Sequence, residues 1–352
     1  MRILITGGAG FIGSHLSDHL LQHGYDVRVL DQGLSLNRDV ELIRGDICDR
    51  AVIQRALAGV DAVFHFAARV GVAQSMYEIA AYTATNSLGT AMLLEQLTER
   101  PVQRLIVASS LGIYGEGLYA TRDGRCVEDA SRSLDQLRDS EWEPRDANGD
   151  ELVPRPTPEW KRPHLKSVYA LSKFDQERLA LLTAQAYRIP AVALRFFNVY
   201  GSRQTIANPY SSVLFSFAAR LLNGRAPLVF EDGRQQRDFV HVRDAVQACR
   251  LALEQPKERV DGRVFNVGSG EPARIDQVAQ ILADTIGVAI EPEMTGRYRP
   301  GDIRHCVADL TLARNCLGYA PQVRLADGLS DFVDWMAGSA SVKTRGVAAC
   351  AS

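Results

Sequence analysis

The chain has 352 residues, of which 46% are hydrophobic and 23% are charged, and 40 Lys and Arg against 42 Asp and Glu give a formal net charge of -2. These values exclude a disordered acidic or basic chain, and they argue against a protein that binds nucleic acid through overall positive charge. No apolar segment reaches the roughly 18 residues that a membrane-spanning helix needs, so we expect a soluble, cytoplasmic protein. The six cysteines form no C-x-x-C pair, which predicts free thiols and no metal site.

Strands and helices are predicted to alternate in the N-terminal half. Short apolar segments predict strands at 2–6, 26–31, 40–44, 62–66 and 104–109, and apolar residues at helical spacing predict helices at 11–23, 82–99 and 167–187. Two further strands are expected at 191–196 and 264–267. This alternation predicts an α/β fold in which right-handed crossovers join parallel strands.

Residues 115–165 interrupt the alternation with a long polar segment rich in charge and proline. Connections of this length are typically lids, binding loops or partly disordered, and the sequence leaves these alternatives open. After about residue 198 the spacing becomes less regular, which predicts a second, smaller lobe of mixed structure. Helices are expected there at 211–223, 242–253, 275–286 and 325–336.

A glycine-rich turn follows the first predicted strand and precedes the first predicted helix. Residues 6–13 read Thr-Gly-Gly-Ala-Gly-Phe-Ile-Gly and contain both G-x-G-x-x-G and G-x-x-G-x-x-G. Such a turn lets backbone N–H groups approach a pyrophosphate at a helix N-terminus. It therefore predicts a Rossmann-type, doubly wound parallel sheet that binds a dinucleotide, with contacts from Gly7, Gly10, Phe11, Ile12 and Gly13.

Carboxylates follow the next two predicted strands. Asp31 ends the second strand, where a carboxylate can accept hydrogen bonds from an adenosine ribose and would repel a 2′-phosphate. This position favours NAD over NADP as the cofactor. Asp46 and Ile47 follow the third strand, where a carboxylate and a backbone N–H could hold the adenine.

Tyr169 and Lys173 lie four residues apart on a predicted helix, so both fall on one face. A nearby ammonium favours the phenolate and should lower the pKa of the tyrosine toward neutrality, which suits proton transfer at a hydroxyl group. Ser109 and Ser110 end a predicted strand, at the edge where open α/β sheets bind ligands.

Taken in order, these motifs resemble those of the extended short-chain dehydrogenases/reductases, in the NAD-dependent nucleotide-sugar epimerase/dehydratase branch. The resemblance covers nearly all of residues 1–337. Its markers are 7–13, 65–68, Asn86, Gly89-Thr90, Ser109-Ser110, Tyr114-Gly115, Tyr169 with Lys173, 195–201, 237–242 and 299–302.

The resemblance implies that Tyr169 is the catalytic acid/base, that Lys173 tunes it and contacts a ribose, and that Ser110 bonds the reacting sugar oxygen. It implies further cofactor contacts from Phe66, Ala67, Ala68, Ser109 and Phe196. It implies substrate contacts from Val70, Ser110, Tyr169, Asn198, Leu228, Phe230, Arg237 and Arg299. Of these, Asn198 and the two arginines would hold a diphosphate, and Leu228 and Phe230 would contact the base.

The residues after Ser110 separate the reactions of this family. Its 4,6-dehydratases carry acidic residues just after the catalytic Ser or Thr, and its decarboxylases usually keep a Glu there, whereas this chain has Leu111 and Gly112. The resemblance therefore implies epimerisation at C4 of a nucleoside-diphosphate sugar, through a 4-keto sugar and tightly bound NAD. A 4-ketosugar reductase remains an alternative, as does a 4,6-dehydratase if Glu116 or another carboxylate serves as the acid. A third alternative is a dinucleotide-binding or scaffold protein without enzymatic activity.

The 115–165 segment, residues 196–204 and Asn208-Pro209-Tyr210 resemble the dTDP-L-rhamnose 4-epimerase-like group. Members of that group often carry paired cysteines near the position of Trp142, where this chain has 146–149 as Asp-Ala-Asn-Gly. We therefore hypothesise dTDP-L-rhamnose as the substrate, without a metal in this segment.

The expected organisation has two parts and a tail. An NAD-binding domain is expected over 1–197, with strands near 239–242 and 264–267 that could interleave with it, and a nucleotide-sugar-binding lobe over 198–337. Residues 338–352 are expected to be a disordered tail. By resemblance, the protein is expected to form a homodimer through the helices near 82–99 and 167–187.

Overall fold

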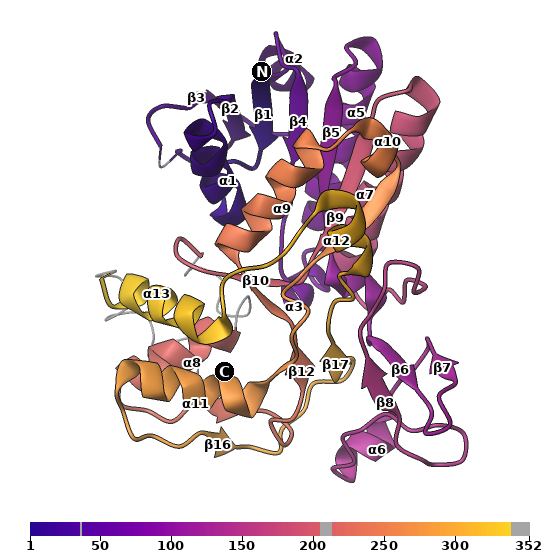
Figure 1. Cartoon of the computed structure of the whole chain (residues 1–352), viewed down its shortest axis with the longest axis vertical. Helices are drawn as coiled ribbons and strands as arrows, with labels where there is room; N and C mark the ends of the chain where they lie inside the picture. The colour runs from indigo at the N-terminus through magenta and orange to yellow at the C-terminus, as the bar shows by residue number, and fades with distance from the viewer. Residues whose placement is uncertain (36, 205–212, 339–352) are drawn as a thin grey trace.

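A seven-stranded parallel sheet, ordered β14-β9-β5-β4-β1-β2-β3, forms the centre of the computed structural model, which describes residues 1–35, 37–204 and 213–338 (Figure 1). The strands are β1 (Arg2–Thr6), β2 (Asp26–Asp31), β3 (Glu41–Arg44), β4 (Ala62–His65), β5 (Arg104–Ser110), β9 (Ala191–Phe196) and β14 (Arg263–Val267). The strand order reverses between β1 and β4, so the sheet is doubly wound. The predicted Rossmann-type fold is confirmed.

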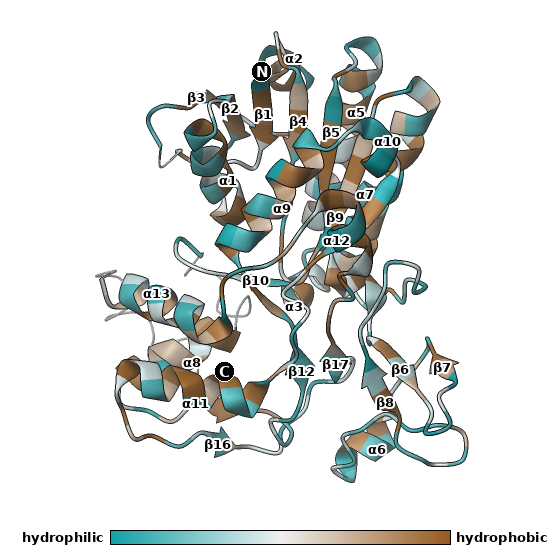
Figure 2. Ribbon diagram, in the orientation of Figure 1, coloured by the Kyte–Doolittle hydropathy of each residue, from teal (hydrophilic) through white to brown (hydrophobic). Residues whose placement is uncertain are grey.

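Helices cover both faces of this sheet. On one face, α1 (Phe11–Gln22) contacts α9 (Val242–Glu254); on the other, α5 (Gly89–Glu99) contacts α2 (Arg50–Ala56) and α7 (Val168–Tyr187). Successive strand residues point to opposite faces, so Ile3 and Ile5 join one core cluster and Leu4 joins the other. Strands buried on both faces are therefore nearly continuous in apolar residues, as the brown strands of Figure 2 show.

The helix predicted at 82–99 is longer and less regular than expected. It begins with α4 (Ile79–Tyr82), passes through a π-helical turn, η1 (Thr83–Leu88), and continues as α5; a short helix, α3 (Val72–Ser75), precedes it. Within η1 the Asn86 side chain is fully buried, accepts a hydrogen bond from Arg69 N at 2.7 Å and donates one to Ser172 Oγ at 2.9 Å. Asn86 therefore ties this turn to α7.

The smaller lobe has its own apolar core between three helices, α8 (Val213–Leu222), α11 (Ile275–Ile286) and α13 (Leu325–Gly338). Its small sheets pair β10 (Asn198–Tyr200) with β13 (Phe239–His241), β11 (Leu228–Val229) with β16 (Glu293–Met294), and β12 (Gln236–Arg237) with β15 (Ala273–Arg274) and β17 (His305–Cys306). Two short helices, α10 (Lys257–Val260) and α12 (Thr311–Leu317), contact each other and belong to the main sheet, since α12 packs against β14 and α9. Residues 211–212 of a predicted helix, Asn208-Pro209-Tyr210, Cys350 and the predicted tail beyond Gly338 lie outside the described residues.

The 115–165 segment folds into its own small structure. After the turn η2 (Leu111–Tyr114), the strand β6 (Leu118–Ala120) pairs antiparallel with both β7 (Cys126–Val127) and β8 (Val153–Arg155), and α6 (Leu134–Arg138) lies beside them (Figure 1). These strands have two or three residues each, too short for apolar periodicity to reveal them in the sequence.

Buried ion pairs attach this segment to the smaller lobe. The Arg304 side chain is fully buried and bonds Glu143 and Glu231, and Arg132 bonds Glu231 at 2.8 Å. Glu143 also accepts from His305 Nε2 at 2.7 Å. Glu143 and Arg132 belong to the 115–165 segment, whereas Glu231 and Arg304 belong to the smaller lobe. Each part therefore neutralises a charge that the other part buries.

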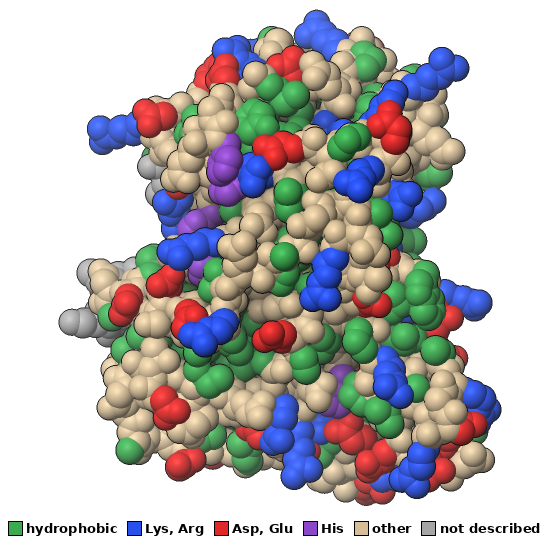
Figure 3. All heavy atoms as spheres, in the orientation of Figure 1, with side chains coloured by type: hydrophobic (Ala, Val, Ile, Leu, Met, Phe, Trp, Pro, Cys, Tyr) green, Lys and Arg blue, Asp and Glu red, His purple; other side chains and the backbone are tan. Residues whose placement is uncertain are grey.

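Figure 3 shows basic and acidic side chains interspersed over the face in view. Within the described ranges, no helix combines the length and the apolar character needed to cross a bilayer.

A second buried ion pair joins α7 to the sheet. Arg195 on β9 donates to Glu177 on α7 through Nη2 at 2.7 Å and Nε at 3.0 Å, and both side chains are almost completely buried. Glu177 also accepts from Ser109 Oγ at 2.6 Å, and Arg195 donates to Tyr114 at 2.9 Å. The pair thus connects α7, β5, β9 and η2.

Replacing one partner should be costly, because it leaves a buried charge without compensation. We expect Arg195→Met to lower the free energy of unfolding in urea by about 3–5 kcal/mol, and the Arg195→Met/Glu177→Met pair to lose less than the two single variants together. The exposed pair Arg138–Asp135 supplies the control, since Arg138→Met should cost less than about 1 kcal/mol. A loss for Arg195→Met no larger than that of the control would contradict this account.

Candidate active site

The glycine turn lies between β1 and α1 and packs too tightly for larger residues. Gly7 has a φ of +74°, and a Cβ there would lie 2.7 Å from Ala67 N; a Cβ on Gly13 would lie 2.4 Å from Gly7 O. Gly10 has an extended backbone and directly precedes α1, which begins at Phe11. The first turn of α1 therefore presents its N–H groups beside a loop of three glycines and one alanine, which leaves room for a pyrophosphate. The chain here fits the dinucleotide predicted from the sequence.

Asp31 and Asp46 lie at the same edge of the sheet, because β2 pairs parallel with β1 and β3 pairs parallel with β2. Asp31 accepts hydrogen bonds from Ala9 N at 3.0 Å and Gly33 N at 2.8 Å, so it also fixes the glycine turn. Asp46 is exposed and accepts from Cys48 N at 2.8 Å. The Ile47 side chain is buried in the core, which leaves only its backbone for the predicted adenine contact.

Phe66, Ala67 and Ala68 follow β4 at this edge. The N–H groups of Phe66 and Ala67 donate to Thr6 Oγ1 at 3.2 Å, which joins the end of β4 to the residue before the glycine turn. Phe66 also packs edge-to-face against Phe196, with ring centroids 5.8 Å apart. The predicted cofactor residues of β1, β4 and β9 are thus brought together.

Ser110 and Tyr169 border Gly112. A Cβ on Gly112 would lie 3.4 Å from Ser110 Oγ and 3.7 Å from Tyr169 Cε1. Ser110 is the last residue of β5 and caps η2 by accepting from Gly112 N at 3.1 Å, whereas Tyr169 lies in the first turn of α7. Lys173 follows one turn later and is almost completely buried. The structure therefore gathers the predicted catalytic residues at the carboxyl end of β5.

The electrostatics of this group differ from the expectation for Tyr169. Burial raises the pKa of Tyr169, and the hydrogen bond with Ser110 lowers it only in part. Burial also lowers the pKa of Lys173 to about 7, against a smaller opposing effect of Glu177. The pKa of Tyr169 therefore moves in the direction opposite to the one that the Tyr169–Lys173 spacing predicted, because desolvation is its largest cause.

Apart from Ser110 and Tyr169, the predicted substrate residues form three groups. Arg299 stacks over Phe230, with its Cζ 4.7 Å from the ring centroid, and Leu228 begins β11 two residues before Phe230. The Asn198 amide donates to Asp238 O at 2.9 Å, next to Arg237, whose guanidinium is bonded to the carbonyls of residues 303 and 304. Val70 lies in the segment that follows β4, and its side chain is 56% exposed.

Glu116, which the sequence left open as an acid, is committed elsewhere. It is 2% exposed, and its carboxylate accepts from Arg304 N at 2.9 Å, His305 N at 3.3 Å and Tyr119 Oη at 2.9 Å. Its role is to hold β6 and β17 together.

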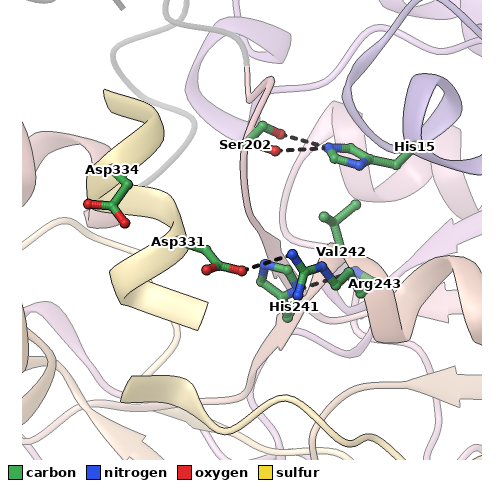
Figure 4. Close-up of a pocket in the computed structure, with 7 residues that line it drawn as sticks. All are labelled: His15, Ser202, His241, Val242, Arg243, Asp331 and Asp334. Atoms are coloured by element: carbon green, nitrogen blue, oxygen red, sulfur yellow. Dashed lines mark hydrogen bonds and ion pairs between the residues drawn. The ribbon is translucent and has the colours of Figure 1, made fainter. Parts of the chain in front are cut away.

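A separate pocket of about 360 Å³ lies among α1, α9 and α13. Figure 4 shows its lining, in which His15 Nε2 is 2.9 Å from Ser202 O and Arg243 pairs with Asp331 at 3.1 Å. The pocket shares no residue with the predicted site, and burial lowers the pKa of both His15 and His241.

The described part of the chain holds no group of three or more His, Cys, Asp and Glu side chains placed to bind a metal. The five cysteines in that part carry free thiols.

Sequence reasoning missed a polar network behind Lys173. The Lys173 amine donates to Gln176 Oε1 at 2.8 Å, and Gln176 donates to Thr90 Oγ1 at 2.9 Å. Thr90 lies 2.8 Å from His65 Nε2. Gln176 falls three residues after Lys173 on one helical face, and that spacing was the available signal.

Comparison with known proteins agrees with this geometry. A model of the NAD dependent epimerase/dehydratase family matches residues 3–133 and 147–268. A dTDP-L-rhamnose 4-epimerase from Burkholderia thailandensis is 30% identical over 96% of this chain and 95% of its own. A dTDP-glucose 4,6-dehydratase from Actinoplanes sp. is 31% identical over 95% of this chain and 97% of its own.

Solved structures of epimerases also resemble this chain over nearly its whole length. A UDP-glucuronic acid 4-epimerase from Bacillus cereus, in complex with UDP-glucuronic acid and NAD, superposes with a TM-score of 0.77 at 28% identity, over 95% of this chain and 98% of that one. The predicted family and its NAD cofactor are confirmed: this chain belongs to the NAD dependent epimerase/dehydratase family.

Proposed function

We propose that the protein is a nucleoside-diphosphate-sugar 4-epimerase that retains its NAD. The observation that carries this proposal is the bare surface at Gly112, between Ser110 Oγ and the Tyr169 ring. A side chain at this position would begin beside the Ser110 hydroxyl and the edge of the Tyr169 ring, and glycine supplies none. The site therefore offers groups for proton transfer at one sugar hydroxyl and no carboxylic acid at residues 111 and 112 to eliminate water.

In this proposal the chain's own residues bind the sugar and move one proton. Tyr169 removes the proton from the C4 hydroxyl and later returns it, while Ser110 holds the same oxygen. The Lys173 ammonium favours the phenolate and opposes the effect of burial on Tyr169. The glycine turn and Asp31 would hold NAD, which supplies reversible two-electron chemistry at C4.

Two alternatives remain within the family. A 4,6-dehydratase is supported by the Actinoplanes relative, but the carboxylate of Glu116 is fully engaged with Arg304, His305 and Tyr119. A 4-ketosugar reductase would use the same hydroxyl groups with a cofactor that leaves after each turnover. Retention of NAD distinguishes the epimerase from the reductase.

For the substrate we propose dTDP-L-rhamnose, on the basis of the Burkholderia relative and the resemblance of the 115–165 segment. We propose that residues 198–337 bind the nucleotide, with Phe230 and Arg299 at the base and Arg237 and Asn198 at the diphosphate. Residues 1–197 would hold NAD together with β14. The free thiols fit a reducing compartment, which supports a cytoplasmic location.

We also propose a homodimer. Exposed apolar side chains gather on α7 and on the elements that contact it, η1 and α3: Leu171 and Leu182 on α7, Leu88 on η1 and Val72 on α3 are each more than half exposed. Covering such side chains is the usual role of a subunit interface.

The reaction can be identified with purified protein and a panel of dTDP-, UDP- and GDP-sugars, without added cofactor. We expect dTDP-L-rhamnose to yield an isomer of unchanged mass with inverted C4 configuration, detected by mass spectrometry and NMR. Loss of water would instead indicate a dehydratase. A gain of two hydrogens that requires added NAD(P)H would indicate a reductase.

Removal of the Tyr169 hydroxyl should stop proton transfer without disturbing the fold. We expect Tyr169→Phe to lower kcat by about 10²–10⁴-fold, as for loss of a general acid or base. Tyr187, exposed at the end of the same helix, provides the control, and Tyr187→Phe should retain full activity. Equal activity in both variants would remove Tyr169 from the mechanism.

The dimer is tested by light scattering after size exclusion. The wild type should have twice the 38.7 kDa mass of one chain, and Leu182→Asp should shift it to the monomer because a carboxylate would be buried at the interface. Leu134→Asp, on the equally exposed apolar residue of α6, should leave the dimer intact. A monomeric wild type would refute the dimer.

A further inference from the structure

We infer that Gln176 is a positioning residue for Lys173: its buried amide oxygen fixes the amine and favours the ammonium form that the proposed epimerisation needs. The inference rests on that proposed function. Gln176 is 1% exposed and Lys173 is 3% exposed, and the Lys173 Nζ to Gln176 Oε1 distance is 2.8 Å. A buried amine without an acceptor would lose its hydrogen bonds to water and form none in the protein, which disfavours the charged form.

The orientation of the Gln176 amide follows from its neighbours, beginning at the glycine turn. Thr6 Oγ1 accepts from the N–H groups of Phe66 and Ala67, so its own hydrogen is donated to His65 Nδ1, 2.8 Å away. Burial lowers the pKa of His65 to about 3, which keeps the ring neutral and places its hydrogen on Nε2. His65 therefore donates to Thr90 Oγ1 at 2.8 Å.

Thr90 completes the chain of hydrogen bonds. Its hydroxyl hydrogen is donated to Asn86 O at 2.5 Å, so toward Gln176 it can only accept. The atom of Gln176 that lies 2.9 Å from Thr90 must then be the amide nitrogen, and the same nitrogen lies 3.4 Å from Ala67 O. The amide oxygen is left facing Lys173.

Other charges near Lys173 are already committed. Glu177 is paired with Arg195 and accepts from Ser109, and His65 is neutral. Tyr169 carries a hydroxyl whose pKa burial raises. Gln176 is thus the acceptor that the structure gives the amine. Since burial lowers the pKa of Lys173 to about 7, a single hydrogen bond changes the fraction of ammonium at neutral pH.

The chain has only five lysines, at 161, 166, 173, 257 and 343, so NMR of protein labelled with [ε-¹³C]lysine can follow Lys173 directly. Lys173→Arg assigns its signal. We expect Gln176→Leu to lower the pKa of Lys173 by about one unit, because the acceptor for the charged form is lost. Gln176→Glu should raise this pKa, because a carboxylate then faces the amine.

The control is Gln96→Leu, because Gln96 is another buried glutamine, on α5, bonded to Gln54 at 2.9 Å. It should change thermal stability without moving the Lys173 titration. Unchanged titration in both Gln176 variants, or a shift in the same direction in both, would overturn the inference. If Gln176→Leu does not fold, the nearly isosteric Gln176→Glu decides by the sign of its shift.

The alkaline limb of the profile of kcat against pH should move to lower pH in Gln176→Leu and to higher pH in Gln176→Glu, as the pKa of Lys173 does. Because the titration uses no sugar, shifted pKa values in a protein without epimerase activity would refute the proposed function and leave the role of Gln176 intact. Epimerase activity together with an unchanged Lys173 titration in the Gln176 variants would instead support the proposed function and refute the role of Gln176.

Discussion

The ion pair between Glu177 and Arg195 is the contact on which the site depends. It fastens α7, which carries Tyr169 and Lys173, to the strand that neighbours β5, and the same carboxylate accepts from Ser109. A helix lying on a sheet through apolar contacts alone could slide; a two-bond contact between a guanidinium and a carboxylate fixes its register. The distance from the Tyr169 ring to Ser110 is thereby set by groups that take no part in the chemistry.

Parallel strands explain why residues so distant in the chain meet. The carboxyl ends of β1, β2, β4, β5 and β9 all lie at one edge of the sheet. Residues at or just after these strand ends form hydrogen bonds with one another. Thr6 binds the chain after β4, and Asp31 binds the glycine turn. Polar side chains that could bind ligands therefore first hold this edge in shape.

The 115–165 segment shows a different use of charge. Arg304, fully buried, is satisfied by carboxylates from both the segment and the smaller lobe, so neither part could bury its charges alone. This mutual neutralisation orders a stretch whose composition resembles that of a loop. It also explains why Glu116 is structural: its carboxylate joins β6 to the backbone of β17.

The sequence by itself determined the succession of strands and helices along the chain, the glycine turn and the position of Asp31 at a strand end, because periodicity and motif spacing are local properties. The roles expected of Ser110, Tyr169 and Lys173 came from the resemblance to a family. Only the tertiary structure decided the short strands β6–β8, the commitment of Glu116 and the network of Gln176, since each depends on partners far away in the chain. It also decided the direction of the Tyr169 pKa, because burial is a property of the whole fold and desolvation raises this pKa.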